Sequence, residues 1–511
     1  MIAAVRSAAV LGVEAFEVTV DVHVAPGLPQ FTLVGLPAGA VRESRERVVA
    51  ALANSGFAVP PRRIVVNLAP ADVRKDGTAL DLPIAIGILV ALDALPPESI
   101  ASLVLLGELA LDGSLRPVRG ALPIALRASR TGRTLVLPPA NLPELARLPD
   151  LRCAAPATLL ALVAALRAGA LPAASAPRPT GPASHADDLA DVVGQPVARR
   201  ALEIAAAGGH NLLLVGPPGA GKTMLARRLP TILPALADEE ALEVLAVRSV
   251  AGLPVGSDAL VRPFRAPHHT ISAAALVGGG SPPRPGEVTL AHNGVLFLDE
   301  LLEFPRHVLD ALREPLEDGR VLIARTTATV TLPARFALVG ATNPCPCGHA
   351  GEEDGRCVCV PADVERYAAR LSGPLADRID LHVRVAAVAP RDLASVGDDP
   401  SASGSAAVRR RVEEARARQR ARAPGDAAGN ARRTGAWLER EARLHPEARG
   451  LLVRAAERLG LSARGFYRVL RVARTVADLD AMPDVGPVHV AESLRFRPAS
   501  PRKAERRVRL C

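Results

Sequence analysis

The sequence predicts an α/β fold, and three features of the 511-residue chain support that prediction. Through the middle of the chain, short apolar runs typical of buried strands alternate with helical segments, which favours a parallel sheet covered by helices. One of these runs leads through a glycine-rich loop directly into a helix. The C-terminal part, in contrast, shows only helical periodicity. At roughly 100–200 residues per domain, the length indicates about three domains.

Residues 1–167 form the first expected domain. Its helical runs include the amphipathic segment Ala40–Asn54, and its strand-like runs are Phe16–Val24, Arg63–Leu68, Leu103–Leu106 and Thr134–Leu137. This order predicts an α/β or α+β domain. Residues 168–186 are rich in Ala, Pro and Ser with little periodicity, so we expect a linker there.

Residues 187–389 form the second expected domain, and residues 407–497 the third. Between them, residues 390–406 include the run Asp-Asp-Pro-Ser-Ala-Ser-Gly-Ser, which is typical of a second linker. The third domain is predicted to be helical, with helices at Ala407–Arg422, Pro446–Leu459, Ser462–Leu479 and Val488–Leu494. The arginine-rich tail, residues 498–511, is expected to be disordered.

The charge is unevenly distributed along the chain. Residues 401–511 carry 24 Arg and 1 Lys against 12 Asp plus Glu, an excess of 13, whereas the whole chain has a net charge of +9. The other 400 residues therefore carry a net charge of −4. A basic module beside a nearly neutral body indicates a polyanionic partner such as nucleic acid. The alternative is a solvated, arginine-rich helical surface, and charge alone does not separate the two.

Several classes of protein are excluded by composition. The longest apolar run, Leu82–Leu92, is well short of the ~20 residues needed to cross a bilayer. Only a six-residue apolar stretch precedes Glu14, so the N-terminus is interpreted as a strand and not as a signal peptide. Six cysteines among 511 residues do not make a disulfide scaffold. We expect a cytoplasmic protein with reduced thiols.

The strongest motif is a phosphate-binding loop. The apolar strand His210–Val215 precedes it and the helix Met224–Leu229 follows it. The expected nucleotide-binding residues are Gly216, Pro217, Pro218, Gly219, Ala220, Gly221, Lys222, Thr223 and Met224. Glycines let backbone N–H groups point at phosphate oxygens, and the helix presents its positive N-terminus. Lys222 is expected to reach the β- and γ-phosphates, and Thr223 to bind Mg²⁺.

Polar residues end two further strands. Asp299 and Glu300 follow the apolar run 294–298, where buried carboxylates need a partner such as a metal. Asp299 is expected to hold the Mg²⁺ shell, and Glu300 to polarise the attacking water. Asn343 follows the run 336–340 and is interpreted as a group that orients the water or binds the γ-phosphate. The alternative for Asn343 is a turn-forming role before Pro344.

Four stretches carry a family resemblance. They are Val193-Gly-Gln-Pro-Val-Ala-Arg-Arg-Ala-Leu-Glu-Ile-Ala-Ala-Ala-Gly-Gly-His-Asn211, Phe264-Arg-Ala-Pro-His-His-Thr-Ile-Ser272, Gly278-Gly-Gly-Ser-Pro-Pro-Arg-Pro-Gly-Glu287 and Asn343-Pro-Cys-Pro-Cys-Gly348. Through them the chain resembles the YifB/ComM family of magnesium chelatase-like AAA+ ATPases over about residues 2–480. The resemblance implies an AAA+ P-loop NTPase core, a Lon protease-like α/β N-terminal domain and a helical C-terminal lid. It also implies ATP and Mg²⁺ as cofactors and a homo-hexameric ring.

The resemblance adds two arginines to the expected site. Within Asp377-Arg378-Ile-Asp380, Arg378 would be the arginine finger that reaches the γ-phosphate bound by the neighbouring subunit. The alternative for Arg378 is a surface salt bridge. Arg464 would be the second sensor, acting in cis, with Arg468 and Arg471 as competitors on nearby helical faces.

Four cysteines lie within 15 positions, in the pairs Cys345/Cys347 and Cys357/Cys359. Two pairs that close a short polar loop fit a tetrahedral Zn²⁺ site, with His349 as a substitute ligand. Reduced thiols without metal, or disulfides, are the alternatives. If zinc binds, its role is expected to be structural, because the loop adjoins Asn343.

The Lon-like resemblance raises the question of peptidase activity. The stretch that corresponds to the Lon serine loop, Lys75–Pro83, contains Thr78 but no serine, and the stretch Ala121–Ala125 lacks the lysine. A hydroxyl without a base is a weak nucleophile, so we expect no peptidase activity.

The partner expected from the resemblance is DNA, branched or single-stranded. Arg284 and Arg325 lie in loops that face the pore in related rings, and are candidate phosphate contacts. Aromatic residues are only 2% of the chain, so backbone contacts rather than base stacking are expected to dominate. ComM-like proteins are helicases for branch migration of imported DNA in natural transformation, and this is the preferred hypothesis. A protein-remodelling ATPase, and a metal-chelatase motor subunit, which would lack the Lon-type domain, are the alternatives.

Overall fold

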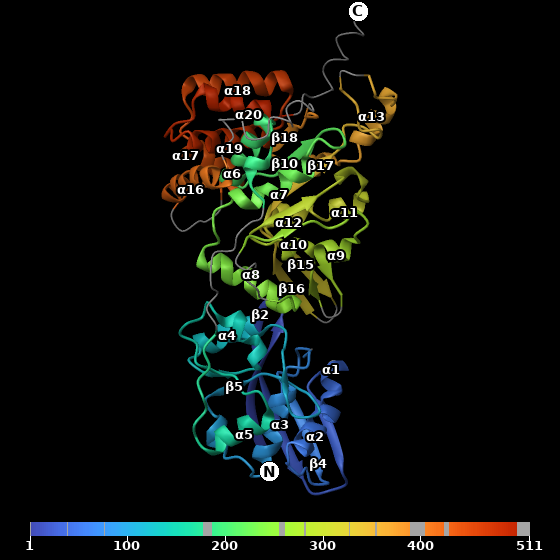
Figure 1. Ribbon diagram of the computed structural model, residues 1–511, viewed down its shortest axis with the longest axis vertical. Helices are drawn as coiled ribbons and strands as arrows, with labels where there is room; N and C mark the ends of the chain where they lie inside the picture. Colours follow the sequence, from blue (N-terminus) through green and yellow to red (C-terminus); the bar gives the residue numbers. More distant parts are fainter. Residues whose placement is uncertain are drawn as a thin grey trace, which may run out of the picture.

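The computed structural model describes residues 2–37, 39–75, 77–176, 187–254, 261–280, 283–325, 328–352, 355–388, 404–423 and 429–497. Most of the two expected linkers, and all of the tail 498–511, lie outside these ranges. The molecule is elongated, with the N-terminal domain at one end and the C-terminal helices at the other (Figure 1). Within the described ranges, every helix is too short or too polar to cross a membrane.

The described part of the N-terminal domain contains two sheets of three or more strands, beside a short two-stranded hairpin. The larger has the order β1 (Ile2–Leu11), β2 (Glu14–Ala25), β4 (Arg63–Ala69), β3 (Gln30–Val34), and only the β3–β4 pair is parallel. The smaller is parallel, with the order β5 (Leu103–Leu105), β8 (Thr134–Val136), β9 (Cys153–Ala154). The longest apolar run of the sequence forms α3 (Asp81–Ala91), every residue of which is buried. Its apolar run is continuous because the helix is covered on all sides.

Within the described residues, the N-terminal domain also contains four further α-helices and a hairpin. The expected helix Ala40–Asn54 is interrupted at Glu43, which separates α1 (Gly39–Arg42) from α2 (Ser44–Asn54). The others are the hairpin β6 (Glu108–Leu109) and β7 (Leu115–Arg116), and the helices α4 (Ala121–Arg130) and α5 (Leu159–Arg167).

The central domain is built on a five-stranded, fully parallel sheet. Its order is β11 (Phe264–Arg265), β14 (Val295–Leu298), β17 (Ala337–Thr342), β10 (Leu212–Val215), β18 (Leu381–Arg384). Side chains alternate between the faces of these strands. Leu212 and Leu214 pack with α6 (Pro196–Gly208) and α7 (Lys222–Ile232), whereas Leu213 packs into the core on the opposite face.

The opposite face is covered by short helices and two hairpins. The helices are α8 (Asp238–Ala251), α9 (Ala273–Val277), α10 (Glu287–Leu290), α11 (Arg306–Asp310), α12 (Arg313–Asp318), α13 (Pro361–Ala368) and α14 (Gly373–Ala376). The hairpins are β12 (Gly278–Gly279) with β13 (Arg284–Pro285), and β15 (Arg320–Arg325) with β16 (Ala328–Pro333).

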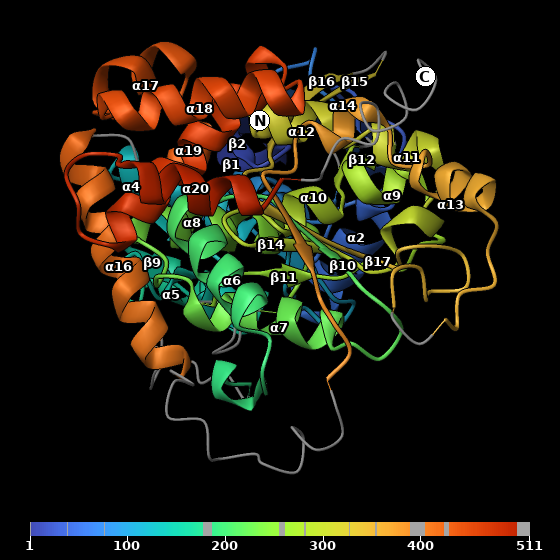
Figure 2. The same cartoon turned by 90° about the horizontal axis from the view of Figure 1, so that it is seen from above.

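Five helices form the C-terminal domain: α16 (Ser405–Arg422), α17 (Gly435–Glu441), α18 (Pro446–Leu459), α19 (Ala463–Leu479) and α20 (Pro487–Arg495). They gather on one side of the core, away from α13 (Figure 2). Apolar residues of α16 and α19, such as Val412 and Val472, belong to the same core cluster as α6. The helix α16 starts two residues before the expected boundary at 407, and α17 was not predicted.

Many C-terminal arginines face the protein interior. Arg411 pairs with Glu203, Arg422 makes two 2.6 Å bonds to the carboxylate of the buried Asp478, and the completely buried Arg474 donates to three backbone carbonyls. Part of the excess positive charge is therefore structural. Exposed arginines remain on α18, at Arg449, Arg454 and Arg458.

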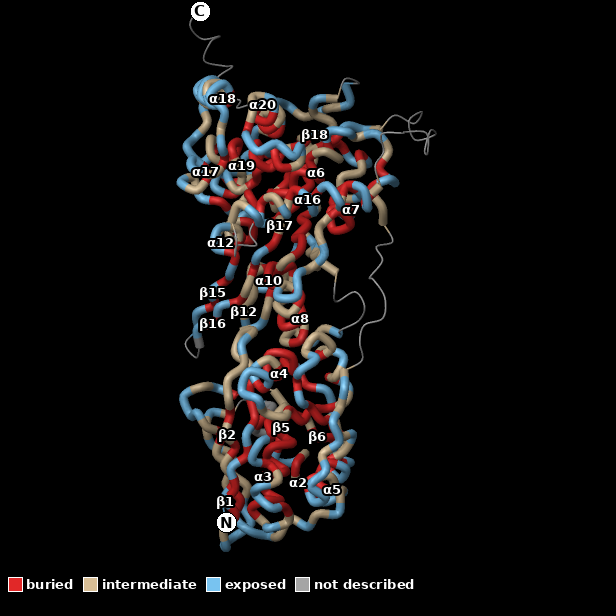
Figure 3. Tube along the Cα trace, turned by 90° about the vertical axis from the view of Figure 1, so that its left-hand side faces the viewer, coloured by how far each residue is buried: buried red, intermediate tan, exposed pale blue. Residues whose placement is uncertain are grey.

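The N-terminal domain meets the core at two places. A Cβ added to Gly12, in the turn between β1 and β2, would lie 2.5 Å from Val330 of β16, so this turn lies directly on the hairpin. The second contact is at Ser249 of α8. The backbone N–H of Gly120 donates to the Ser249 carbonyl, and the backbone N–H of Leu122 donates to the Ser249 hydroxyl. Figure 3 shows buried residues running through the interior of both domains.

Candidate nucleotide site

The glycine-rich loop lies at the carboxyl end of β10, as the sequence predicts. The strand is buried because its four residues, Leu-Leu-Leu-Val, lie between two helical layers. Gly219 and Gly221 have φ of +77° and +85°, which side chains rarely adopt, and nothing lies within 4 Å of a Cβ added to either. The loop is therefore an open cradle of backbone N–H groups at the N-terminus of α7, a geometry that suits phosphate.

Lys222 is held by the loop itself. Its Nζ donates to the carbonyls of Gly216 at 2.6 Å and Pro217 at 2.8 Å, and to the Oδ1 of Asn343 at 3.0 Å. Burial lowers the pKa of Lys222, and the charges of Asp299 and Glu300 oppose that shift. A half-buried ammonium beside an open glycine loop is suited to attract phosphate oxygens.

Thr223 and Asp299 form a pair of oxygen ligands. The Thr223 hydroxyl donates to Oδ2 of Asp299 at 2.7 Å, so α7 and the end of β14 meet at this point. A hydroxyl and a carboxylate next to a phosphate cradle match the ligands that Mg²⁺ takes in nucleotide sites. The residues present therefore fit the metal. Met224, the last residue of the predicted loop, is 43% exposed.

Glu300 follows Asp299 with a left-handed backbone, at φ +50°. A non-glycine residue in this region is strained, and such strain is concentrated at functional sites. Its carboxylate lies 3.3 Å from Nδ1 of His269, in the segment that follows β11. His269 in turn packs against the ring of His268, 4.1 Å away, and edge-on to Phe304. The contact between His269 and Glu300 joins segments distant in the sequence, and the sequence did not predict it.

Arg378 lies at the opposite end of the strands from the glycine-rich loop. It precedes β18, and its carbonyl accepts a 2.8 Å hydrogen bond from Asn211, the residue before β10. Because β10 and β18 are parallel, Arg378 lies at their amino ends and Lys222 beyond their carboxyl ends. The guanidinium donates to Glu317 of α12 and to the carbonyl of Pro374.

Arg464 lies near Arg378, at the amino end of β18, and the cis role expected for it stays a prediction. Its guanidinium is 3.9 Å from Glu317, the residue that also binds Arg378, and its side chain is 68% exposed. The start of α19 packs beside the amino end of β18, so Arg464 does not face the loop of its own subunit. The other two candidates for the second sensor have partners within the protein. Arg468 is buried against Asp380, and Arg471 donates to the carbonyl of Arg433.

The four clustered cysteines come together. Their sulfur atoms lie within 4.8 Å of one another, and all four are free thiols. His349 is not part of the group, because its Nδ1 lies 2.6 Å from Glu352. Of the expected zinc ligands, the four cysteine sulfurs therefore lie together, and His349 does not join them.

The Lon-like stretch of the N-terminal domain is engaged in internal contacts. Lys75 is completely buried, and its Nζ donates to the carbonyl of Gly35 at 3.3 Å. Thr78 donates to Glu108. The neighbouring Asp81 is buried and accepts a 2.7 Å bond from Arg47. Arg47 therefore compensates the charge of the buried Asp81 carboxylate.

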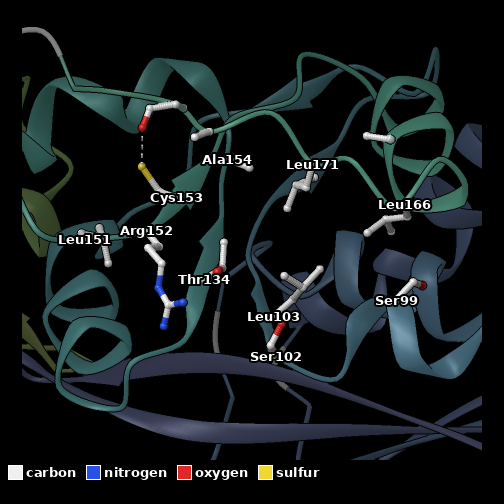
Figure 4. A pocket seen from close by; sticks show the side chains of 14 residues that line it. Ser99, Ser102, Leu103, Thr134, Leu151, Arg152, Cys153, Ala154, Leu166 and Leu171 are labelled. Atoms are coloured by element: carbon white, nitrogen blue, oxygen red, sulfur yellow. Dashed lines mark hydrogen bonds between the residues drawn. The ribbon is translucent and has the colours of Figure 1, made fainter.

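A separate cavity of about 530 Å³ lies in the N-terminal domain. Figure 4 shows Leu103 and Leu166 among its lining residues, and the Cys153 thiol, which donates to the carbonyl of Ala174 at 3.2 Å. The polar groups on its wall, Ser99, Ser102, Thr134 and Arg152, belong to different elements. The cavity contains none of the predicted site residues, and we assign it no function.

The candidate DNA contacts lie on adjoining hairpins. Arg284 and Arg325 are both exposed. A Cβ added to Gly279 of β12 would be 3.5 Å from a guanidinium nitrogen of Arg325, so the two hairpins lie side by side. Arg265 of the neighbouring strand β11 pairs with Glu287 at 2.6 Å.

Comparisons with known proteins place all three domains in one family. The model described as "Magnesium chelatase, subunit ChlI" matches residues 188–393, "Subunit ChlI of Mg-chelatase" matches residues 20–141, and "Magnesium chelatase, subunit ChlI C-terminal" matches residues 402–497.

Full-length relatives are similar along nearly the whole chain. The chain is 45% identical to competence protein ComM of Haemophilus influenzae over 97% of each chain, and 45% identical to YifB of Escherichia coli over 96% of each. It is also 29% identical to Lon protease 2 of Bacillus subtilis, over 30% of this chain and 32% of that protein. The last match agrees with the Lon-like part of the predicted fold.

Proposed function

The chain belongs to the YifB/ComM family of magnesium chelatase-like AAA+ proteins, and on this premise we propose that it is an ATP-hydrolysing ring motor that acts on DNA. One observation supports the proposal most strongly. At the carboxyl ends of the parallel strands, four side chains converge: Lys222, Thr223, Asp299 and Asn343. These four side chains come from three strand ends and face the same open loop.

Residues 216–224 bind the triphosphate of ATP in this proposal. The loop amides and Lys222 hold the phosphate oxygens, and Thr223 and Asp299 bind Mg²⁺, which would neutralise charge on the phosphates when bound. Glu300 accepts a proton from the attacking water. Asn343, already 3.0 Å from Lys222, orients that water or the γ-phosphate.

Two arginines complete the site of the next subunit. We propose that Arg378 and Arg464 act in trans, because both contact Glu317 and lie at the amino ends of the strands, away from their own loop. A guanidinium that reaches the γ-phosphate offsets charge in the transition state. This arrangement requires an oligomer, and a closed ring gives every loop one such neighbour. We propose a homo-hexamer.

DNA is the proposed substrate of the motor. Arg284 and Arg325 present two exposed cations on adjoining hairpins, and α18 presents more. Guanidinium groups without neighbouring aromatic residues favour phosphate contacts over base stacking. The 45% identity to a competence protein favours branch migration of imported DNA in natural transformation as the reaction served.

The alternatives differ in what stimulates hydrolysis. A protein-remodelling ATPase would respond to unfolded protein and not to DNA. A metal-chelatase motor subunit would respond to a partner chelatase subunit, and the three matching family models give this alternative its support.

Steady-state ATPase activity tests the proposal. The full chain is assayed alone, with a branched DNA junction and with an unfolded protein, at low and moderate salt. We expect strong stimulation by the junction that weakens with salt, because phosphate contacts dominate. Stimulation by protein alone, or no response to DNA at any salt, would overturn the DNA part of the proposal.

A further inference from the structure

Four sulfur atoms converge beside the nucleotide site. The Sγ of Cys345 lies 3.3 Å from that of Cys347 and 3.8 Å from that of Cys357, and the Cys347–Cys357 distance is 3.7 Å. Cys359 lies within 4.8 Å of the other three. A disulfide would bring two sulfurs to about 2.05 Å, so none of these pairs is bonded. Tetrahedral zinc, with Zn–S bonds of about 2.3 Å, spaces its sulfurs by about 3.8 Å.

The surroundings of the sulfurs fit a structural metal. Cys345 is completely buried and accepts the backbone N–H of Ala350 at 3.2 Å. Cys347 accepts backbone N–H groups of His349 and Val358. Backbone donors around thiolates fix the ligands in place and offset their negative charge. His349 is taken by Glu352, so the donor set is four sulfurs and no water ligand is needed.

The same turn touches the nucleotide loop. Gly348, at φ +89°, lies between the cysteines and the nucleotide loop. A Cβ added to Gly348 would be 2.6 Å from Cδ of Pro218 and 3.9 Å from Cγ of Asn343. Asn343 is only two residues before Cys345 and accepts the hydrogen bond from Lys222. Whatever fixes the cysteines therefore fixes one wall of the loop and the position of Asn343.

We propose that Cys345, Cys347, Cys357 and Cys359 bind one zinc ion as thiolates, and that this ion holds the turn at Gly348 against Pro218 and Asn343. Binding releases the thiol protons to solvent and needs no oxidant or reductant. The coupling of this metal to nucleotide binding rests on the proposed function of the loop, whereas the metal site itself does not.

Metal content tests the site directly. We expect about one zinc per chain in the full-length protein, and a thiolate-to-metal absorption band when cobalt replaces zinc. Cys359→Ser should lose most of the zinc. Cys153→Ser is the matched control, because Cys153 lies in the N-terminal domain and serine keeps its donor to Ala174. A chain without zinc, or cobalt binding without the thiolate band, would overturn the proposal.

Nucleotide affinity tests the coupling. A zinc-selective chelator should weaken Mg-ATP binding by about tenfold, and added zinc should restore it. Gly348→Ala keeps all four cysteines and addresses the case in which Cys359→Ser does not fold; it should retain zinc and still weaken Mg-ATP binding. Unchanged affinity after zinc removal would overturn the coupling. If the zinc-loaded wild type fails to bind Mg-ATP, the proposed function fails instead, and the metal content still decides the zinc site.

Discussion

The carboxylate of Glu300 lies 3.3 Å from Nδ1 of His269, a contact between the end of β14 and the segment after β11. Glu300 is the proposed acceptor of the proton from water, and the segment that holds it adjoins the hairpins that carry Arg284 and Arg325. On the proposed function, this contact would let His269 restrain Glu300, and the predictions below test that role.

Replacing His269 by Ala should raise basal ATP turnover by about two- to fivefold, because the Glu300 carboxylate is released. Stimulation by DNA should fall in the same variant. Steady-state turnover with and without DNA measures both effects. His307→Ala, at an exposed position of α11, is the control. A fall in basal turnover would show that His269 positions Glu300 for catalysis and does not restrain it.

Replacing Glu300 by Gln should leave ATP bound and slow hydrolysis by about 10²- to 10⁴-fold, the usual contribution of a general base. The amide keeps the size of the side chain but cannot take the proton. Nucleotide retention on the purified chain, measured beside turnover, separates the two steps. Normal turnover in this variant would assign the base to another residue.

Removing the guanidinium of Arg325 should weaken DNA binding for all sequences alike. Because a phosphate contact releases counterions, Arg325→Ala should also lower the slope of log affinity against log salt by about 1. Fluorescence anisotropy at several salt concentrations gives the slope. Arg130→Ala, at an exposed site in the N-terminal domain, is the comparison. Equal slopes in the two variants would exclude Arg325 as a contact.

The Glu243 carboxylate ties α8 to the start of two strands. It accepts from His292 at 3.0 Å and Asn293 at 2.8 Å, and pairs with Arg335. The hydrogen bond from His292 is the largest cause that lowers the pKa of Glu243 to about 2. A depressed carboxyl pKa contributes stability above the unfolded pKa, and this contribution is lost as the pH falls through the folded value.

Glu243→Gln should therefore lower the free energy of unfolding at pH 7, by about 1 kcal/mol after allowance for solvent screening of a side chain that is 42% exposed. The difference from wild type should shrink as the pH falls below about 4.5 towards 2. Urea unfolding across this range measures it. Glu239→Gln, at an exposed position of the same helix, is the control. A difference that does not change with pH would contradict the assigned cause.

The strands and helices around the loop could be predicted because their signals are local. A buried strand, a glycine loop and the first turn of α7 follow one another in the chain, and α18 begins and ends as predicted, at Pro446 and Leu459. The short helix α17 was missed, since its seven residues give too little periodicity.

Contacts between distant segments could not be predicted. The resemblance suggested a cis role for Arg464, and the sequence did not show that this residue lies near Arg378, because that placement depends on how α19 packs. In the same way, the basic composition of α16 did not show that Arg411 pairs with Glu203 and Arg422 with the buried Asp478. The roles of the site residues stay predictions.

The most direct test of a site shared between subunits is an ATPase assay on mixed variants. Lys222→Ala lacks nucleotide binding but keeps Arg378, and Arg378→Ala keeps the loop but lacks the arginine; each alone should be nearly inactive, the second by about 10³-fold or more. Mixed in one ring, they form some interfaces with both groups intact, and we expect turnover to recover in proportion to those interfaces. No recovery in rings shown to be mixed, or normal turnover of Arg378→Ala alone, would contradict the shared site.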